Sequence, residues 1–181
     1  MLNWRLSSRR RAAFTASRKV EPLARLEIRE SVGAGEYPCL VEIWRSAVDA
    51  THDFLAESDR AGIEARLASE YFPQVELFVV ERDGRRVGFA GVSGQNLAML
   101  FVDADVRGRG VGTALLSFVI RECGVGFVDV NEQNRQAVEF YSRRGFVVAG
   151  RSELDDQGRP YPLLHMALNR KHLDAASSLP S

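Results

Sequence analysis

The sequence has few of the residues from which disulfide frameworks and metal sites are built, with two cysteines and three histidines among 181 residues. Cys39 and Cys123 match no disulfide pattern or metal-ligand spacing, and the scattered histidines offer none either. No apolar run approaches the roughly 20 residues that span a bilayer, and residues 1–25 lack the apolar core of a secretory signal. We therefore expect a protein without metal or membrane contact, located in the reducing cytoplasm.

The chain also lacks an excess of charge of either sign, with 24 basic and 24 acidic residues. Residues 1–25 hold seven arginines and lysines against Glu21, which leaves 17 basic and 23 acidic residues for the rest of the chain. The body is therefore acidic and its cations are dispersed, which argues against a nucleic-acid surface. An acidic body is compatible with a cationic amine as substrate.

The length fits one domain that can bury a core of its own. We expect this domain over residues 26–169. Residues 1–25 fit a disordered basic leader, an organellar transit segment, or residues upstream of the true start. Residues 170–181 are predicted to form a loose tail.

Glycine is concentrated in Arg107-Gly108-Arg109-Gly110-Val111-Gly112-Thr113, between the apolar run from Leu97 to Val102 and a helical pattern that starts at Ala114. Three glycines within five residues let successive backbone N–H groups turn toward one point. The helix that follows adds unpaired donors and a partial positive charge. This order of strand, glycine loop and helix predicts a binding site for a diphosphate.

Two common nucleotide motifs fit this loop poorly. A P-loop needs a lysine after its glycines, and none follows here. The dinucleotide fingerprint needs Gly-x-Gly-x-x-Gly near the start of a βαβ unit, whereas this loop has Gly-x-Gly-x-Gly in mid-chain.

A second motif runs from Asn131 to Tyr141 and is followed by Gly145-Phe146. The residues at positions 137, 140, 141 and 144 fall at helical intervals of three and four, which places Tyr141 beside a buried stripe. Gly145 is the expected C-cap of this helix.

Together, Arg-x-x-Gly-x-Gly and Asn-x-x-Ala-x-x-Phe-Tyr resemble the two cofactor half-sites of the Gcn5-related N-acetyltransferases (the GNAT superfamily), which use acetyl-coenzyme A. The resemblance covers Leu26 to Leu168. Locally, Val48 to Leu55 and Gly150 to Leu164 look like the YjaB-type bacterial members.

The resemblance implies roles for particular residues. The glycine loop, from Arg107 through Gly112 to Thr113, would hold the diphosphate of acetyl-coenzyme A. Asn134 would contact the cofactor arm, and Tyr141 would face the thioester sulfur. The backbone of Leu100, Phe101 and Val102 on one side, and of Asp129 to Asn131 on the other, would pair with the pantetheine arm like an added strand.

The hydrophobic pattern predicts the order strand, two helices, three strands, helix, strand, helix, two strands. Asp83-Gly84 signals a hairpin, and Pro73 ends the second helix, whose stripe is Ile63, Leu67 and Tyr71. This order matches an α/β fold of the GNAT type. We expect a splayed, mostly antiparallel sheet of six or seven strands flanked by about four helices.

The expected reaction is direct attack of a neutral amine on the thioester, which needs an acid and a base. Tyr141 is the expected acid, because a phenol with a pKa of about 10 matches a coenzyme thiol. A glutamate serves as the base in parts of the superfamily, but Asn96 occupies that position here and could only orient a water. A water relay ranks first as the route for the proton, Asp129 second, and His52 third because an imidazole titrates in a suitable range.

Thr51, His52, Phe54 and Tyr161 are the expected lining of the acceptor pocket. These side chains leave the acceptor open between a protein lysine, a protein N-terminus and a small-molecule amine. The protein is expected to be a monomer or a homodimer. The alternative function is a non-catalytic module that binds or senses acyl-coenzyme A, and the presence of Tyr141 favours the enzyme.

Overall fold

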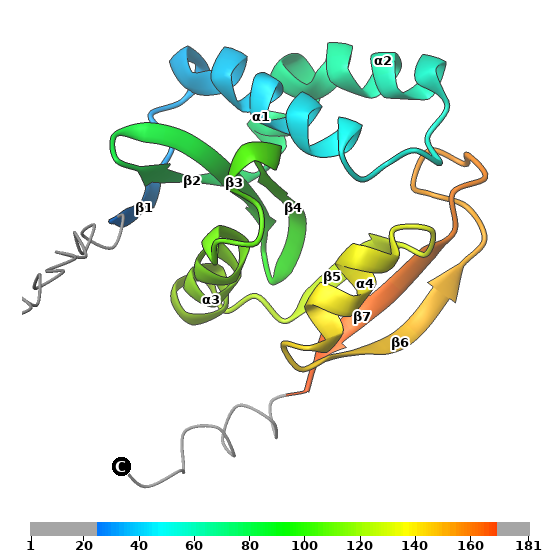
Figure 1. The fold of residues 1–181 in the computed structure, drawn as a ribbon. Helices are drawn as coiled ribbons and strands as arrows, with labels where there is room; N and C mark the ends of the chain where they lie inside the picture. Colours follow the sequence, from blue (N-terminus) through cyan, green and yellow to red (C-terminus); the bar gives the residue numbers. More distant parts are fainter. Residues whose placement is uncertain (1–24, 170–181) are drawn as a thin grey trace, which may run out of the picture.

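Seven strands form one mixed sheet in the computed structural model (Figure 1), which describes residues 25–169. In chain order they are β1 (Leu26–Glu30), β2 (Glu76–Arg82), β3 (Arg85–Ser93), β4 (Asn96–Val102), β5 (Phe127–Asn131), β6 (Phe146–Ser152) and β7 (Leu163–Leu168). Their order across the sheet is β1-β2-β3-β4-β5-β7-β6. The expectations for the leader before Arg25 and for the tail 170–181 lie outside the described residues.

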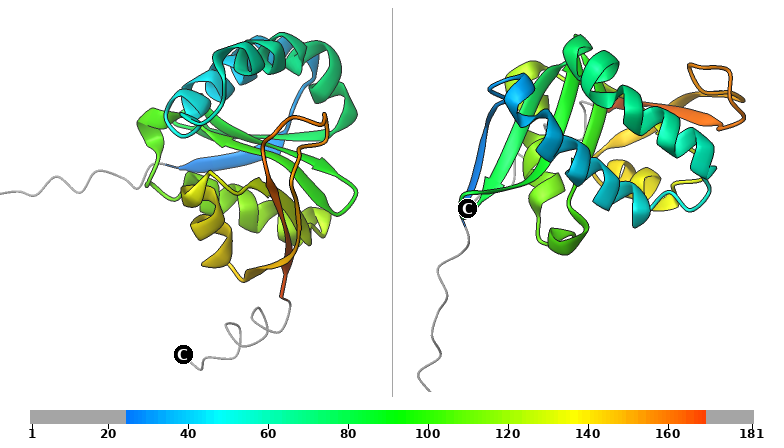
Figure 2. Two further views of the ribbon diagram at one scale, coloured as in Figure 1. Left: turned by 90° about the vertical axis from the view of Figure 1, so that its right-hand side faces the viewer. Right: turned by 90° about the horizontal axis from the view of Figure 1, so that it is seen from above.

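The described α-helices are α1 (Tyr37–Asp49), α2 (Glu57–Arg66), α3 (Val111–Cys123) and α4 (Arg135–Ser142). In Figure 2, α1 and α2 cover one face of the sheet, while α3 and α4 lie on the other. The predicted order of elements and the predicted mixed α/β architecture are confirmed. None of these helices is long and apolar enough to cross a membrane.

The strands of the first half bury side chains on both faces, since a helix covers each face. Phe78, Val80 and Ala90 pack with α3 in one core. Val79 and Phe89 pack with α1 in a second core. The alternation of side chains along each strand sends neighbouring residues to opposite cores.

The hairpin between β2 and β3 is confirmed. Asp83 and Gly84 have φ angles of 53° and 77°, so both central residues adopt the left-handed conformation of a type I′ turn. The strands pair up to the turn itself, with Arg82 opposite Arg85.

The sheet opens between β4 and β5, as predicted. These strands are parallel, and only Asn96 with Phe127 and Leu97 with Val128 are paired. The strands beyond these pairs diverge, which is visible in Figure 1 as the separation of β4 from β5. All other neighbouring strands are antiparallel.

Two helix ends differ from the sequence prediction. The helix expected through Tyr71 ends at Arg66 and continues as a π-helical turn, Leu67–Tyr71. Gly145 is not the C-cap of α4, which is Arg143. The N–H of Arg144 bonds to the carbonyl of Tyr141, and the N–H of Gly145 bonds to that of Ser142. These tight turns move the left-handed residue, with a φ of 87°, two positions past the cap.

A buried carboxylate joins β1 to the start of α1. Glu36 is 2% exposed, and its oxygens accept hydrogen bonds from Arg29, Arg86, the Ser31 hydroxyl and the Val32 N–H. These donors, with Arg29 the strongest, hold the pKa of Glu36 well below its usual range. The buried negative charge of Glu36 is therefore fully paired with hydrogen-bond donors.

Candidate active site

The glycine loop lies between the end of β4 and the start of α3. Asp103, which is 7% exposed, accepts hydrogen bonds from Ser46 of α1 and from Arg85 of β3. The same carboxylate accepts from the N–H of Asp105 and caps the short turn that leads into the loop. The start of the loop is therefore fixed to both α1 and β3.

The three glycines of the loop differ in what the structure requires at their positions. Gly108 and Gly110 have φ angles of 73° and 83°, and a Cβ on either would meet no protein atom. The left-handed backbone is therefore what requires glycine at these two positions. A Cβ at Gly112 would lie 3.5 Å from the Phe140 ring, which is an ordinary contact.

The N-terminus of α3 is free to bind an anion. Gly110 is its N-cap residue, and no side chain caps the helix. The N–H groups of the first turn have no partner within a helix, and the helix dipole adds partial positive charge. This end of α3 faces a cavity.

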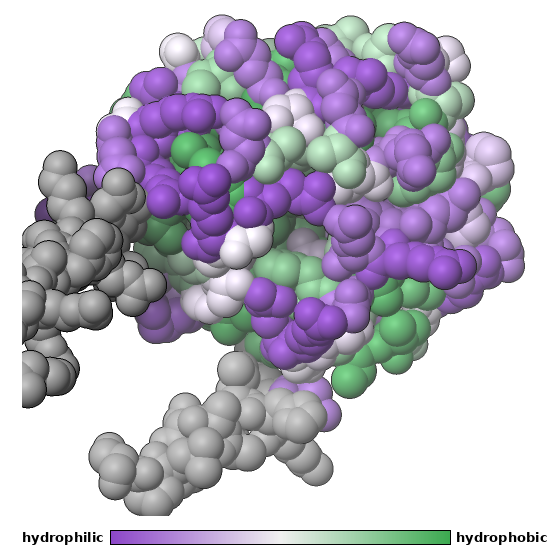
Figure 3. Space-filling model, in the orientation of Figure 1, coloured by the Kyte–Doolittle hydropathy of each residue, from purple (hydrophilic) through white to green (hydrophobic). Residues whose placement is uncertain are grey.

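That cavity has a volume of about 620 Å³ and lies between α1, β4, α3 and α4. Its opening is part of the hollowed middle of the face shown in Figure 3. The expected site residues that line it are Thr51, His52, Leu100, Phe101, Val102, Arg107, Gly108, Gly110, Val111, Gly112, Thr113, Asn134 and Tyr141. Those that do not line it are Phe54, Asn96, Arg109, Asp129, Asn131 and Tyr161.

Asn134 connects α4 to the cavity. Its Oδ1 accepts a hydrogen bond of 3.0 Å from the N–H of Ala137 and so caps the helix. Its Nδ2 is then directed at His52, 3.5 Å from Nε2. The amide oxygen of Asn134 therefore caps α4, while the amide nitrogen presents a hydrogen-bond donor at the cavity wall.

His52 lies at the end of α1 and is neutral. Thr51 donates its only hydroxyl proton to the Ala47 carbonyl at 2.8 Å, so its Oγ1 accepts from Nδ1 of His52 at 2.7 Å. Nε2 therefore carries the lone pair. Burial, and then the charge of Arg107, lower the pKa of His52 to about 4. The expected titration in the neutral range is thus wrong, because the ring is desolvated among Phe54 and Phe101.

Tyr141 lies on α4 with its ring in the core and is 6% exposed. The ring contacts Phe140 and Phe146, with centroids 5.1 and 5.6 Å away. Its hydroxyl finds no hydrogen-bond partner within residues 25–169. Burial raises the pKa of the phenol above its usual range, so the hydroxyl keeps its proton at neutral pH.

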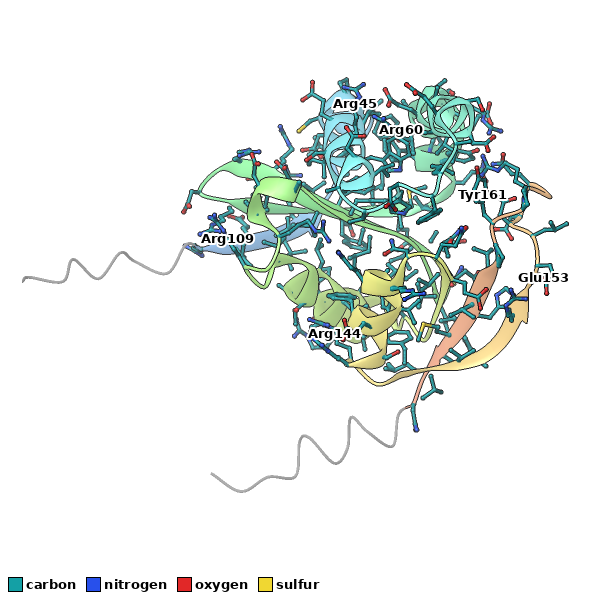
Figure 4. The ribbon with its side chains drawn as sticks, turned by 45° about the vertical axis from the view of Figure 1, so that its right-hand side comes forward. Arg45, Arg60, Arg109, Arg144, Glu153 and Tyr161 are labelled. Carbon is teal, nitrogen blue, oxygen red and sulfur yellow. The ribbon has the colours of Figure 1, made fainter. Side chains whose placement is uncertain are left out.

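Three arginines give the cavity a positive wall, and two of them had no predicted role. Arg107 bonds to Gln136, while Arg143 and Arg144 follow α4. The Arg144 guanidinium lies 3.7 Å from the centre of the Phe140 ring and bonds to Thr113 of α3. Figure 4 shows Arg144 beside α3. Its Nε is buried without a partner in the described residues.

The remaining candidates lie away from the cavity. Asn96 starts β4 at the end farthest from the glycine loop, opposite Ser93 and Phe127, and does not line the cavity. Asp129 is not a solitary carboxylate, because its Oδ1 lies 2.6 Å from Nδ1 of His165. His165 of β7 is therefore part of a polar pair with Asp129.

Tyr161 joins the connection between β6 and β7 to the start of α2. Its hydroxyl donates to Asp59 at 2.5 Å and accepts from the Ala56 N–H at 3.1 Å. The ring lies 6.4 Å from that of Phe54, and Figure 4 shows Tyr161 below α2. Two of the four residues expected to line the acceptor pocket, Phe54 and Tyr161, thus meet where this connection reaches α2.

Within residues 25–169, no three His, Cys, Asp or Glu side chains gather in a way that could hold a metal ion.

Comparison with known proteins identifies the family to which this fold belongs. Residues 47–169 match the acetyltransferase (GNAT) domain family, so the chain belongs to the GNAT acetyltransferases and uses acetyl-coenzyme A. It is 47% identical over 128 residues to the peptidyl-lysine N-acetyltransferase YjaB of Salmonella typhimurium, which covers 70% of this chain and 88% of the relative. The YjaB enzyme of Escherichia coli is 49% identical over 130 residues, covering 71% and 87%.

A solved structure gives the same result. The solution structure of the apo form of Escherichia coli YjaB has a TM-score of 0.73 and 44% identity, covering 80% of this chain and 98% of that one. The chain is therefore an N-acetyltransferase, and the resemblance inferred from the two motifs is confirmed. These relatives favour the enzyme over the non-catalytic binding module.

Proposed function

We propose that this N-acetyltransferase moves the acetyl group of acetyl-coenzyme A to the ε-amine of lysine side chains in proteins. This chain matches most of the length of the two YjaB enzymes, which are named peptidyl-lysine N-acetyltransferases. The match supports the same class of acceptor for this chain. One observation carries the proposal: the uncapped end of α3 and the Tyr141 side chain border the same cavity. An anchor for a diphosphate and a proton donor then act on the same bound molecule.

The cavity residues fit coenzyme A. The N–H groups from Gly108 to Thr113 offer donors to the diphosphate, and Arg107 adds charge-assisted hydrogen bonds. The left-handed glycines at 108 and 110 keep that side of the loop free of Cβ atoms. Arg143 and Arg144 place further positive charge on the cavity wall beside α4.

The open edge of β4 suits an amide-rich arm. Beyond Leu97, β4 has no partner strand on the β5 side, so the backbone groups of Leu100 to Val102 are available for pairing there. Their side chains pack into the two cores at the same time, since backbone pairing and side-chain burial use different directions. Asn134 adds its Nδ2 donor on the α4 side.

Tyr141 is the proposed general acid. Bound acetyl-coenzyme A supplies a thioester whose sulfur must receive a proton as it leaves. The phenol keeps its proton because burial raises its pKa. Its hydroxyl is not engaged by another side chain of the described residues, so it is available to donate to a group in the cavity.

The base must take a proton from the acceptor ammonium. His52 is a weak candidate, because a pKa of about 4 makes the imidazole a poor acceptor at neutral pH. Asn96 cannot accept a proton and lies away from the cavity. The remaining routes for this proton are a water relay and then Asp129, which lies beside the split. This is the order that the sequence suggested.

The acceptor class is tested by measuring thiol release from acetyl-coenzyme A with four amines. These are a peptide with one lysine and a blocked N-terminus, the same peptide with arginine in place of the lysine, a lysine-free peptide with a free N-terminus, and a polyamine. We expect turnover with the first and mass-spectrometric acetylation at its lysine. Faster turnover with the free N-terminus or the polyamine would overturn the lysine assignment, while no turnover with any amine would overturn transfer itself.

A further inference from the structure

Outside the cavity, three polar side chains from neighbouring strands form a hydrogen-bonded series. Oδ1 of Asp129 on β5 lies 2.6 Å from Nδ1 of His165 on β7, and Nε2 of that ring lies 2.7 Å from Oγ of Ser152 on β6. Asp129 and His165 are directly opposite each other in the strand register. Gly150 is opposite His165 on the other side, where a Cβ would lie 3.4 Å from the ring.

The partners fix the proton positions of the neutral imidazole. A carboxylate only accepts hydrogen bonds, so Nδ1 of His165 carries the proton and donates it to Asp129. Nε2 then holds the lone pair, and the Ser152 hydroxyl donates to it. Rotation of this hydroxyl frees the lone pair, which leaves one basic nitrogen with an anion on the opposite side of the ring.

The series stands at the open part of the sheet. Asp129 is the first residue of β5 beyond Val128, the last residue that pairs with β4. Val128 and Val130 belong to the core that contains α3, so the Asp129 side chain points to the opposite face. The side chains of His165 and Asp129 are 40% and 38% exposed, which gives water access to both.

We propose that Asp129, His165 and Ser152 form a proton-accepting unit for the acceptor amine, with the imidazole of His165 as the group that holds the proton. This inference rests on the proposed function, since it concerns the same transfer. The acceptor reaches the thioester at the open split of the sheet, and the series lies beside this split on the face opposite α3.

The step balances as a simple proton transfer. One N–H bond of the acceptor ammonium breaks, and an Nε2–H bond of His165 forms, directly or through one water. The amine keeps the electron pair and becomes the neutral nucleophile. The ring becomes an imidazolium that is paired with the Asp129 carboxylate, and its partly exposed side chain returns the proton to solvent.

Other charges around the series are paired among themselves. Arg151, beside Ser152 on β6, bonds to Glu132, which follows β5, and to Glu153, which follows β6. Asp129 is therefore the charged group that contacts the His165 ring within the described residues. A change in activity with pH that depends on both residues would report on this pair.

The experiment compares wild type with His165→Gln, Asp129→Asn and Ser152→Ala, using acetyl-coenzyme A and a lysine peptide over a range of pH. Asp156→Asn is the matched control, because Asp156 is an exposed carboxylate on the turn between β6 and β7. We expect His165→Gln and Asp129→Asn to lower kcat by about a hundredfold with an unchanged Kd for acetyl-coenzyme A. Ser152→Ala should lower it by only a few-fold, and Asp156→Asn should behave as wild type.

Two further measurements keep the outcome clear. Added imidazole should restore part of the activity of His165→Ala, which a purely structural role would not allow. Nitrogen NMR of the wild-type ring should show the proton on Nδ1, and Asp129→Asn should remove that preference. Full kcat in a folded His165→Gln variant, or a proton on Nε2 in wild type, would overturn the relay. Failure of the proposed function differs from this, because wild type itself would then transfer no acetyl group.

Discussion

Nδ2 of Asn134 lies 3.5 Å from Nε2 of His52, which links the N-cap of α4 to the end of α1 across the cavity. The two residues are 82 positions apart in the chain. Because Oδ1 of Asn134 is occupied by the Ala137 N–H, only its donor side can meet the lone pair of His52. The helix cap therefore fixes the Asn134 side chain on one side of the cavity wall, and the hydrogen bond to Thr51 fixes the tautomer of His52 on the other.

Proton NMR should show that His52 titrates near pH 4 in the folded protein. The unfolded imidazole titrates near 6.5, so the native state resists protonation. Stability should therefore fall as the pH drops from about 6.5 toward 4, and His52→Gln should remove this part of the loss. Titration of His52 near 6.5 would show that the ring is solvated and would restore it as a candidate base.

Gly110→Val should weaken acetyl-coenzyme A binding by more than tenfold and also lower the melting temperature, because a β-branched residue resists a φ of 83°. Gly110→Asn is the matched variant, since Asn tolerates the left-handed conformation. Calorimetry should find a near-normal melting temperature but weak binding for Gly110→Asn. Wild-type affinity in both folded variants would show that the loop has no contact with the ligand.

Tyr141→Phe should lower kcat by about a hundredfold, the usual scale for loss of a general acid. The Kd for acetyl-coenzyme A and the melting temperature should change little, because the hydroxyl bonds to no other residue of the described chain. Tyr37→Phe, on a ring packed against Phe72, is the control. Collapse of binding in Tyr141→Phe would make the residue a packing element, and unchanged kcat would remove the acid assignment.

Glu36→Gln should destabilise the fold by about 2 to 3 kcal/mol, because Arg29 and Arg86 lose a buried partner while remaining partly open to water. In wild type the lowered pKa of Glu36 contributes stability above the unfolded value of about 4.3, and this is lost as the pH falls further. Urea unfolding at neutral and acidic pH measures both effects. Glu70→Gln, at an exposed site, should leave stability unchanged.

The sequence predicted those parts of the site that depend on local patterns. The glycine loop and the place of Tyr141 each follow from a short motif with a fixed spacing. The element order also follows from hydrophobic periodicity, which the buried stripe of α1 illustrates.

What the sequence did not predict depends on contacts between distant residues. The pKa of His52 is set by burial and by Arg107, which is 55 positions further along the chain. The pairing of Asp129 with His165 exists only because β5 and β7 are neighbours in the sheet. Arg144 stacks on Phe140 at a spacing of four, a signal that was present in the sequence and assigned to the helix alone.

The two residue pairs between β4 and β5 leave the halves of the sheet joined mainly by packed side chains. Backbone hydrogen bonds between two strands fix one register. A packed core, in contrast, tolerates side-chain substitutions that conserve the total volume. The spacing between the halves can therefore change over evolution through residues such as Val111 and Leu116, without breaking a single strand pair. Divergent descendants of one ancestor could in this way fit acyl chains and amines of different sizes while keeping the same loop for the diphosphate.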